Sequence, residues 1–135
     1  MLLEKIIKKL PVDIQKINIK GLSLDSRQVK KNYLFFAVKG EKYNGENYII
    51  DAIRKGARAI VCDASCKIIK KNTPIIKVKN IKKIITDACK VFYQTKPKNI
   101  IAVTGTNGKS SVAAFYHQIL IAQKIPAAFL GTLGI

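Results

Sequence analysis

The stretch that most constrains the fold is residues 100–120, where an apolar run, a glycine-rich turn and a helical pattern follow one another. The run Ile100-Ile101-Ala102-Val103 is wholly apolar, which is typical of a parallel strand buried on both faces. The turn reads Thr104-Gly105-Thr106-Asn107-Gly108-Lys109-Ser110-Ser111. A helix is expected to begin near Lys109, and its inward-facing residues would be Val112, Tyr116, Ile119 and Leu120. The order of strand, turn and helix predicts an α/β unit.

This turn has the parts that a phosphate-binding loop requires. Gly105 and Gly108 would let backbone N–H groups wrap phosphate oxygens without interference from side chains. The following helix would present its positive end to the anion. Lys109 could reach the outer phosphates, and the Ser110 hydroxyl could ligate Mg²⁺. Val103 stands where the commoner pattern has its first glycine, so a plain structural turn with an exposed lysine is the alternative interpretation.

Residues 1–98 predict a separate, small α/β domain, because short apolar runs alternate there with helical patterns. Strands are expected at residues 33–38, 59–62 and 75–78, and one more at 127–130 in the following unit. A short helix is expected at residues 2–10, where Pro11 would close it. Asn47 would cap a helix that stops at Gly56, and Asn80 would cap the clearest amphipathic helix of the chain. The apolar positions of that last helix are Ile81, Ile84, Ile85, Ala88 and Phe92.

The chain is strongly basic, with 25 lysines and arginines, 8 acidic residues and a formal charge of +17. Such a charge suits nucleic acid or anionic small molecules. The basic residues are scattered, and no aromatic–arginine stacking pattern interleaves them, so a polynucleotide partner is not expected. Residues 99–135 carry only Lys109 and Lys124 as charged side chains. We therefore expect a domain boundary near Pro97-Lys98, with domains at 1–98 and 99–135.

Cysteines and the N-terminus bear on the compartment. Cys62, Cys66 and Cys89 form no C-x-x-C pair, and His117 is the single histidine, so no zinc site is expected. Free, half-buried thiols in a reducing compartment are expected instead, and His117 is expected to be a surface or packing residue. Charged residues interrupt the apolar N-terminus, and no apolar run reaches about 18 residues. The sequence therefore predicts no signal peptide, no membrane span and a cytoplasmic location.

The turn and several segments before it resemble the Mur ligase family. Segments similar to the uridine-nucleotide domain of that family are Leu24-Asp25-Ser26-Arg27, residues 33–40, residues 43–49 and residues 52–61. The loop version Gly-Thr-Asn-Gly, followed by Gly131-Thr132-Leu133-Gly134, is more similar to the MurE type. The resemblance runs from about residue 20 to the end. It implies an N-terminal domain for a UDP precursor, followed by the first β-loop-α-β unit of a central ATP-binding domain.

The family joins an amino acid to the peptidoglycan precursor in an ATP-dependent reaction that passes through an acyl phosphate. The resemblance implies addition of diaminopimelate or lysine to UDP-N-acetylmuramoyl-L-alanyl-D-glutamate, with ATP and Mg²⁺ as cofactors. Lys109 would then neutralise charge during transfer, and Ser110 would ligate the metal. The residues implied for the ATP phosphates are Gly105, Thr106, Asn107, Gly108, Lys109, Ser110 and Ser111. The residues implied for the UDP-sugar are Leu24, Ser26, Glu41, Lys42 and Tyr43, while Arg27 would pair with a phosphate or be buried against Asp25.

Residues 99–135 supply too little structure for a complete ATP-binding domain. Two strands and one helix cannot cover both faces of a sheet or close its edges. A complete ligase of this family would continue for hundreds of residues. We therefore expect the 135-residue chain to be inactive alone, or to need the remainder of a split ligase, with residues 99–135 loosely ordered in solution. The alternatives are a nucleotide- or UDP-precursor-binding module without catalysis, and a basic nucleic-acid-binding protein whose loop is coincidental.

Overall fold

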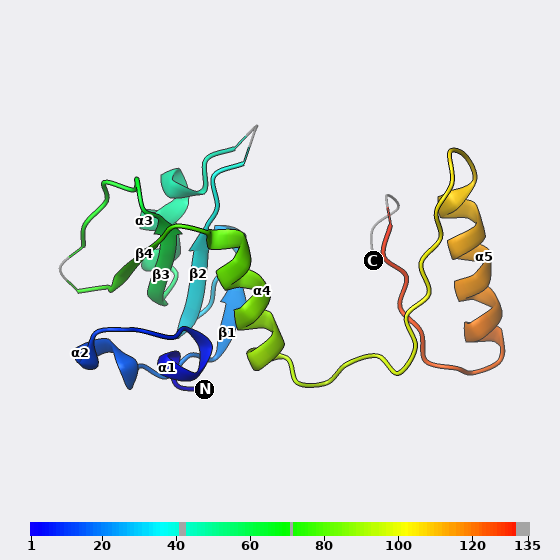
Figure 1. Ribbon diagram of the computed structural model, residues 1–135, viewed down its shortest axis with the longest axis horizontal. Helices are drawn as coiled ribbons and strands as arrows, with labels where there is room; N and C mark the ends of the chain where they lie inside the picture. Colours follow the sequence, from blue (N-terminus) through cyan, green and yellow to red (C-terminus); the bar gives the residue numbers. More distant parts are fainter. Residues whose placement is uncertain (41–42, 71, 132–135) are drawn as a thin grey trace. The chain divides into compact units, whose positions relative to one another are not determined.

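The computed structural model describes residues 1–40, 43–70 and 72–131. The chain divides into two compact units, Met1–Thr95 and Lys96–Ile135 (Figure 1). No helix among the described residues is both long and apolar enough to cross a membrane.

A sheet of four parallel strands forms the centre of the first unit, in the order β1-β2-β3-β4 (Figure 1). The strands are β1 (Gly21–Ser23), β2 (Tyr33–Ala37), β3 (Ala57–Asp63) and β4 (Ile75–Val78). In the register of the sheet, Phe35 lies opposite Ile60, and Ile60 lies opposite Ile75. The α/β class and the three strands predicted in this unit are confirmed.

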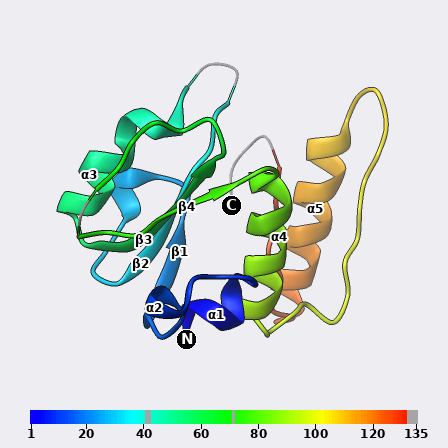
Figure 2. The same ribbon diagram turned by 60° about the vertical axis from the view of Figure 1, so that its left-hand side comes forward.

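Helices cover both faces of this sheet. They are α1 (Leu3–Ile6), α2 (Val12–Gln15), α3 (Ile49–Arg54) and α4 (Ile81–Phe92), with the 3₁₀ turns η1 (Ser26–Gln28) and η2 (Gly45–Tyr48). Figure 2 shows α3 on one side of the sheet and α1 and α4 on the other. Because side chains alternate along a strand, β2 supplies both cores. Leu34 and Phe36 pack with residues of α1 and α4, whereas Phe35 and Ala37 pack with Ile49 of α3.

Helix α4 follows the sequence prediction closely. The Asn80 side chain accepts a hydrogen bond from the Lys83 N–H at 3.0 Å, which satisfies one of the amides that open the helix. Ile81 and Ala88 are buried, and Ile84, Ile85 and Phe92 pack partly buried against the same core. The predicted cap and the predicted apolar face are therefore confirmed.

The helix predicted at residues 2–10 is shorter than expected. Only Leu3–Ile6 is helical, and Lys9 has a positive φ of 61°. The helix ends because Ile7 already has extended backbone, with a φ of −125° and a ψ of 123°, and Pro11 separately disfavours helical backbone at Leu10. Ile7 and Leu10 are buried nevertheless, so the pattern correctly identified core residues while the predicted helix was too long.

The helix predicted to begin at Asn47 is capped by a different residue. Asn44 accepts a hydrogen bond from the Glu46 N–H at 3.0 Å and opens η2, which leads directly into α3. The cap at Asn47 is therefore wrong, because an earlier asparagine starts the segment. The end at Gly56 is confirmed: its φ is 102°, and a Cβ there would lie 2.9 Å from the Lys31 Cα.

The second unit contains one helix among its described residues, α5 (Lys109–Ala122), which begins where the sequence predicted. The strands predicted at 100–103 and 127–130 are wrong, since both segments are irregular. Ile100 is 82% exposed, so it isn't in the buried strand that its neighbours suggested. A strand needs partner strands for its backbone groups, and the described part of this unit provides no sheet for it.

No residue of α5 is fully buried. The positions predicted to face inward are exposed at Val112, Tyr116 and Ile119, and Leu120 is half-buried. His117 takes a packing role, with its Nε2 3.3 Å from the Ala127 carbonyl oxygen and its ring near Phe129. The second unit thus has a formed helix without a covered core.

Candidate functional site

The glycine-rich turn before α5 has the backbone that the sequence motif requires. Gly105 has a φ of 151° and Gly108 a φ of 75°, in a region that residues with a side chain rarely adopt. A Cβ on Gly108 would meet no atom within 4 Å. Glycine is needed at this position for the conformation of the chain, not for lack of space.

The turn delivers the chain directly into the N-terminus of α5. Gly108 is the N-cap residue and offers no side-chain acceptor, and its carbonyl accepts the first helical bond from Val112 N–H at 3.0 Å. The opening N–H groups of any helix lack intrahelical acceptors and carry partial positive charge. Thr106, Asn107 and Ser111 are exposed beside them. This end of α5 therefore has the polarity to attract an anion.

The Lys109 ammonium group lies over the loop itself. Its Nζ donates to the carbonyl oxygen of Gly105 and, at 3.0 Å, to that of Thr106. An ammonium has three N–H donors, so these two bonds hold the charge at the loop and leave a donor for an incoming oxygen. Ser110 is half-buried in the first turn of α5. Within the described residues, no group of three or more His, Cys, Asp or Glu side chains is placed to hold a metal ion.

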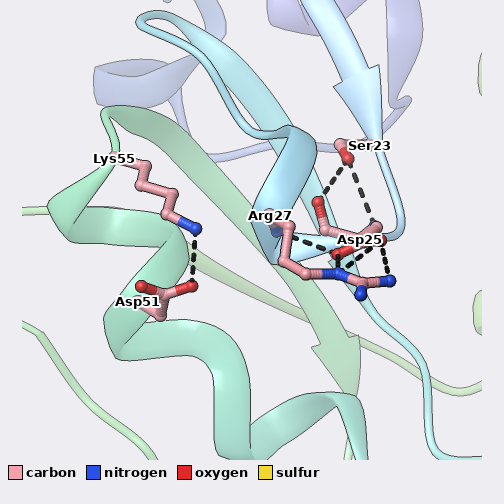
Figure 3. Close-up of polar contacts among 5 residues, drawn as sticks. All are labelled: Ser23, Asp25, Arg27, Asp51 and Lys55. Atoms are coloured by element: carbon pink, nitrogen blue, oxygen red, sulfur yellow. Dashed lines mark hydrogen bonds and ion pairs between the residues drawn. The ribbon is translucent and has the colours of Figure 1, made fainter.

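A second polar cluster lies at the carboxyl end of β1 (Figure 3). The Ser23 hydroxyl donates to the Asp25 carbonyl oxygen at 2.8 Å and accepts from the Asp25 N–H at 3.2 Å. Arg27 donates to the Asp25 carboxylate from its backbone N–H, its Nε and its Nη2, the last at 2.7 Å. These bonds from Arg27 lower the pKa of Asp25 from 3.8 to about 2.

Arg27 is paired with Asp25, as one of the two interpretations of the sequence proposed, but it isn't buried. Its side chain is 85% exposed. Asp25 is the main cause of the raised pKa of Arg27, and Tyr48 adds a smaller contribution. Tyr48 is 44% exposed in η2, and the sequence analysis did not single it out, although an exposed tyrosine next to a helix start could have drawn attention.

Ser26 connects this cluster to α3. It is buried, and its hydroxyl is the main cause of the lowered pKa of Asp51, followed by Lys55, whose Nζ lies 3.2 Å from the Asp51 carboxylate. Figure 3 shows the Asp51–Lys55 pair on α3 beside the β1 turn. Sequence reasoning missed Asp51 because its partner is distant in the chain. Ser26 therefore holds η1 against α3.

The remaining residues predicted for the UDP-sugar follow β1 and β2. Leu24 is 57% exposed and Tyr43 is 73% exposed, which is unusual for side chains of this size. Glu41 and Lys42 lie outside the described residues. Because β1 and β2 are parallel neighbours, the segments that follow them leave the sheet at the same edge. In open α/β sheets that edge is where ligands bind.

Comparison with known proteins decides the family. Residues 18–93, more than half of the chain, match the profile described as "Mur ligase family, catalytic domain". The chain belongs to the Mur ligase family. The resemblance found in the sequence is thereby confirmed, and the matched residues of this Mur ligase chain lie within its sheet unit, ahead of the loop.

Curated relatives of this Mur ligase chain extend the similarity into the second unit. It is 47% identical over 125 residues to UDP-N-acetylmuramoyl-L-alanyl-D-glutamate--2,6-diaminopimelate ligase of Rickettsia bellii, covering 90% of the chain and 24% of the relative. It is 35% identical over 140 residues to the enzyme named UDP-N-acetylmuramoyl-L-alanyl-D-glutamate--2,6-diaminopimelate ligase 2 of Clostridium acetobutylicum, covering 99% of the chain and 29% of the relative. The Mur ligase chain thus spans about a quarter of the length of these relatives, and the second match includes the loop.

Solved structures share its fold. A UDP-N-acetylmuramoyl-L-alanyl-D-glutamate--2,6-diaminopimelate ligase superposes with a TM-score of 0.69 and 23% identity, covering 99% of the Mur ligase chain and 28% of that structure. The MurF ligase of Thermotoga maritima in complex with ADP gives a TM-score of 0.60 and 23% identity, covering 77% and 24%. At this identity the likeness concerns the fold alone.

Proposed function

We propose that this chain is the N-terminal part of an ATP-dependent ligase that adds diaminopimelate to UDP-N-acetylmuramoyl-L-alanyl-D-glutamate in peptidoglycan synthesis. The observation that carries the proposal is the 47% identity to a relative of that name over 125 residues. In this proposal the first unit, with the predicted domain 1–98, binds the UDP precursor. The second unit, with the predicted domain 99–135, begins the ATP-binding domain.

The loop before α5 would bind the phosphates of ATP. Gly105 and Gly108 supply the conformation, the helix end supplies the amides, and Lys109 supplies a cation that is already held at the loop. Ser110 sits in the first turn of α5, where its hydroxyl is a suitable ligand for the Mg²⁺ of a nucleotide. ATP supplies the phosphoryl group that activates the precursor carboxylate for attack by an amine. The residues of this chain bind and orient the phosphates and offset their charge.

The edge of the sheet after β1 and β2 would bind the UDP precursor. The exposed side chains of Leu24 and Tyr43 offer apolar surface for a nucleoside. The buried Ser26, held by Asp51, fixes the turn on which Leu24 lies. Glu41 and Lys42 belong to the same proposed site from the sequence alone. The basic charge of the first 98 residues would favour the diphosphate.

Turnover would need the rest of a Mur ligase. Many large apolar side chains of the second unit are exposed, among them Ile100, Phe115 and Ile119, at 82%, 62% and 55%. Exposed apolar surface of this kind is typical of an interface that another part of a protein covers. The rest of the ligase, in the same polypeptide or in a partner chain, is the proposed cover. A cytoplasmic location is proposed because the reaction consumes ATP there.

Calorimetry with Mg-ATP and, separately, with UDP-N-acetylmuramoyl-L-alanyl-D-glutamate tests this proposal. Lys109→Ala should weaken ATP binding about 10- to 100-fold, because a hydrogen bond to a charged group contributes roughly 1.5–3 kcal/mol. It should leave precursor binding unchanged. Lys124→Ala is the matched control, since Lys124 is the other charged residue after position 98 and follows α5. Equal losses in the two variants would contradict the phosphate role.

Two further outcomes separate the alternatives. A ligation assay with the 135-residue chain alone should show no product, and measurable product would contradict the need for the rest of a ligase. For the second outcome, the chain is fused to the remaining part of a relative. If this fusion binds nucleotide or precursor but forms no ligation product, a binding module is favoured. Salt-sensitive DNA binding without any response to nucleotide would favour the nucleic-acid alternative.

A further inference from the structure

Two buried cysteines lie four positions apart at the end of β3. Cys62 lies within the strand and is 0% exposed, and Cys66 is 1% exposed. Both belong to the core on the α3 side of the sheet, and the Cys66 thiol is one cause of the raised pKa of Cys62. All three cysteines of the chain are free. The expectation of half-buried thiols holds only for Cys89, since Cys62 and Cys66 are fully buried.

A tight turn lies between the two cysteines and returns Cys66 to the same core. The Cys66 N–H donates to the Asp63 carbonyl oxygen at 3.0 Å, which closes a turn of four residues. The Asp63 carboxylate strengthens it by accepting from the Ser65 N–H at 3.0 Å and the Ser65 hydroxyl at 2.8 Å. Because the turn reverses the chain, Cys66 returns to the core that Cys62 enters from the strand.

We propose that Cys62 and Cys66 form a reversible dithiol–disulfide site that hydrogen peroxide oxidises when the turn at 63–66 opens. The first thiolate attacks the O–O bond of the peroxide and becomes a sulfenic acid, with release of water once a proton is taken up. The second thiol then attacks that sulfur: the S–S bond forms, the S–O bond breaks and a second water leaves. Two thiols and one peroxide thus give one disulfide and two waters.

Burial makes the reaction slow in the closed state. Desolvation, followed by the hydrogen bond with Cys66, raises the pKa of Cys62 from 9.0 to about 12. A raised pKa lowers the thiolate fraction of Cys62 at neutral pH. Opening of the short turn would expose Cys66 and supply the reactive thiolate. The resulting disulfide would join the strand to the turn and keep the turn closed.

Cys89 provides the internal comparison. It is half-buried in α4, and the α4 residues Ile81 and Ala88 pack in the core on the opposite face of the sheet. The full chain carrying Cys89→Ser, treated with hydrogen peroxide, should lose the mass of two hydrogen atoms. Dithiothreitol should restore that mass, and mapping should find a peptide linked between positions 62 and 66. The unsubstituted chain, mapped in the same way, gives the result without reliance on a variant that could fold poorly.

The proposal also predicts how the rate responds to opening. Urea at concentrations below the unfolding transition should accelerate formation of the 62–66 disulfide. The rate at which Cys89 is alkylated should change little under the same conditions. Two results would overturn the proposal. One is that the folded Cys89→Ser chain keeps both thiols in hydrogen peroxide, whereas the same chain unfolded in urea forms the disulfide. The other is accumulation of sulfinic acid at either cysteine without loss of two hydrogen atoms.

Discussion

Gly45 is the residue whose substitution most directly tests how closely the start of η2 packs against the end of β2. A Cβ built there would lie 2.6 Å from both the nitrogen and the oxygen of Val38, and 2.9 Å from the carbonyl carbon of Ala37. All three are backbone atoms, so no flexible side chain can move aside. The Gly45 N–H also donates to the Val38 oxygen at 2.8 Å, and a methyl group would push these two atoms apart.

We therefore expect Gly45→Ala to lower the free energy of unfolding by about 2–4 kcal/mol. Overpacking costs roughly 1–3 kcal/mol, and the strained hydrogen bond contributes about 1 kcal/mol more. With a denaturant dependence of roughly 2 kcal/mol per molar urea, the midpoint of unfolding should fall by about 1–2 M. Circular dichroism during urea titration measures this shift, and faster exchange of the residue-45 amide should accompany it.

Gly40→Ala is the matched control, because Gly40 lies on the same loop and its added Cβ would be 3.3 Å from the Tyr43 oxygen. That contact is tight but not prohibitive, so the control should lower the stability by less than about 1 kcal/mol. If Gly45→Ala kept the midpoint of the unsubstituted chain, or fell no further than Gly40→Ala, the close packing of Gly45 on β2 would be refuted.

Two other predictions concern hydrogen bonds made by single side chains. Asn80→Ala removes the acceptor for the Lys83 N–H and should destabilise the first unit by about 1 kcal/mol. Asn80→Ser keeps a side-chain acceptor and should retain most of the stability. Equal urea midpoints for both variants would contradict the role of Asn80 as a cap. Arg27→Ala should raise the pKa of Asp25 from about 2, though not fully to 3.8, because the backbone N–H of residue 27 still donates to it. The folded pKa of Asp25 is depressed, so its contribution to stability is complete above about pH 4 and is lost as the pH falls toward 2. Carboxyl-carbon NMR titration measures the pKa of Asp25. Lys55→Ala is the control, and it should change this pKa little. If the pKa of Asp25 stayed the same in Arg27→Ala, the side-chain pair would be excluded as the cause of the lowered value.

Elements fixed by local signals could be predicted from the sequence. Helix α4 has a capping asparagine, a 12-residue length and one apolar face, and these need no knowledge of the rest of the chain. Strand β2 was found because Leu34, Phe35 and Phe36 form a run that only a sheet covered on both faces can bury. The helix at 2–10 was predicted too long, because the spacing of apolar residues indicates which residues are buried but does not determine the backbone conformation between them.

The strands predicted at 100–103 and 127–130 failed for a different reason. An apolar run becomes a strand only when neighbouring strands satisfy its backbone groups. Within the described residues, the second unit has no sheet to pair with Ile100 and Ile101. The sequence around them is typical of a central strand, whereas their exposed fractions of 82% and 59% are typical of a segment without neighbouring strands. Local pattern and tertiary context therefore disagree in this unit, and context decides.

The candidate site divides in the same way. Gly105 and Gly108 could be identified from the sequence, because their positive φ angles are a local requirement of the turn. The contacts of Ser26 could not, since its partner Asp51 lies on α3 and is brought near only by the fold. Arg27 was left between two interpretations because a guanidinium satisfies either a carboxylate or a phosphate with the same geometry.

The position of Lys109 links the loop to the chemistry proposed for it. A cation at the tip of a helix N-terminus is placed unfavourably, since both the ammonium and the helix end are positive. The loop compensates by turning the carbonyl oxygens of Gly105 and Thr106 toward the Nζ atom. A turn that served only to connect two segments would have no need to hold two positive groups together. An anion between them would remove the repulsion, which supports the proposal that the loop binds a ligand with several negative charges, such as the phosphates of a nucleotide.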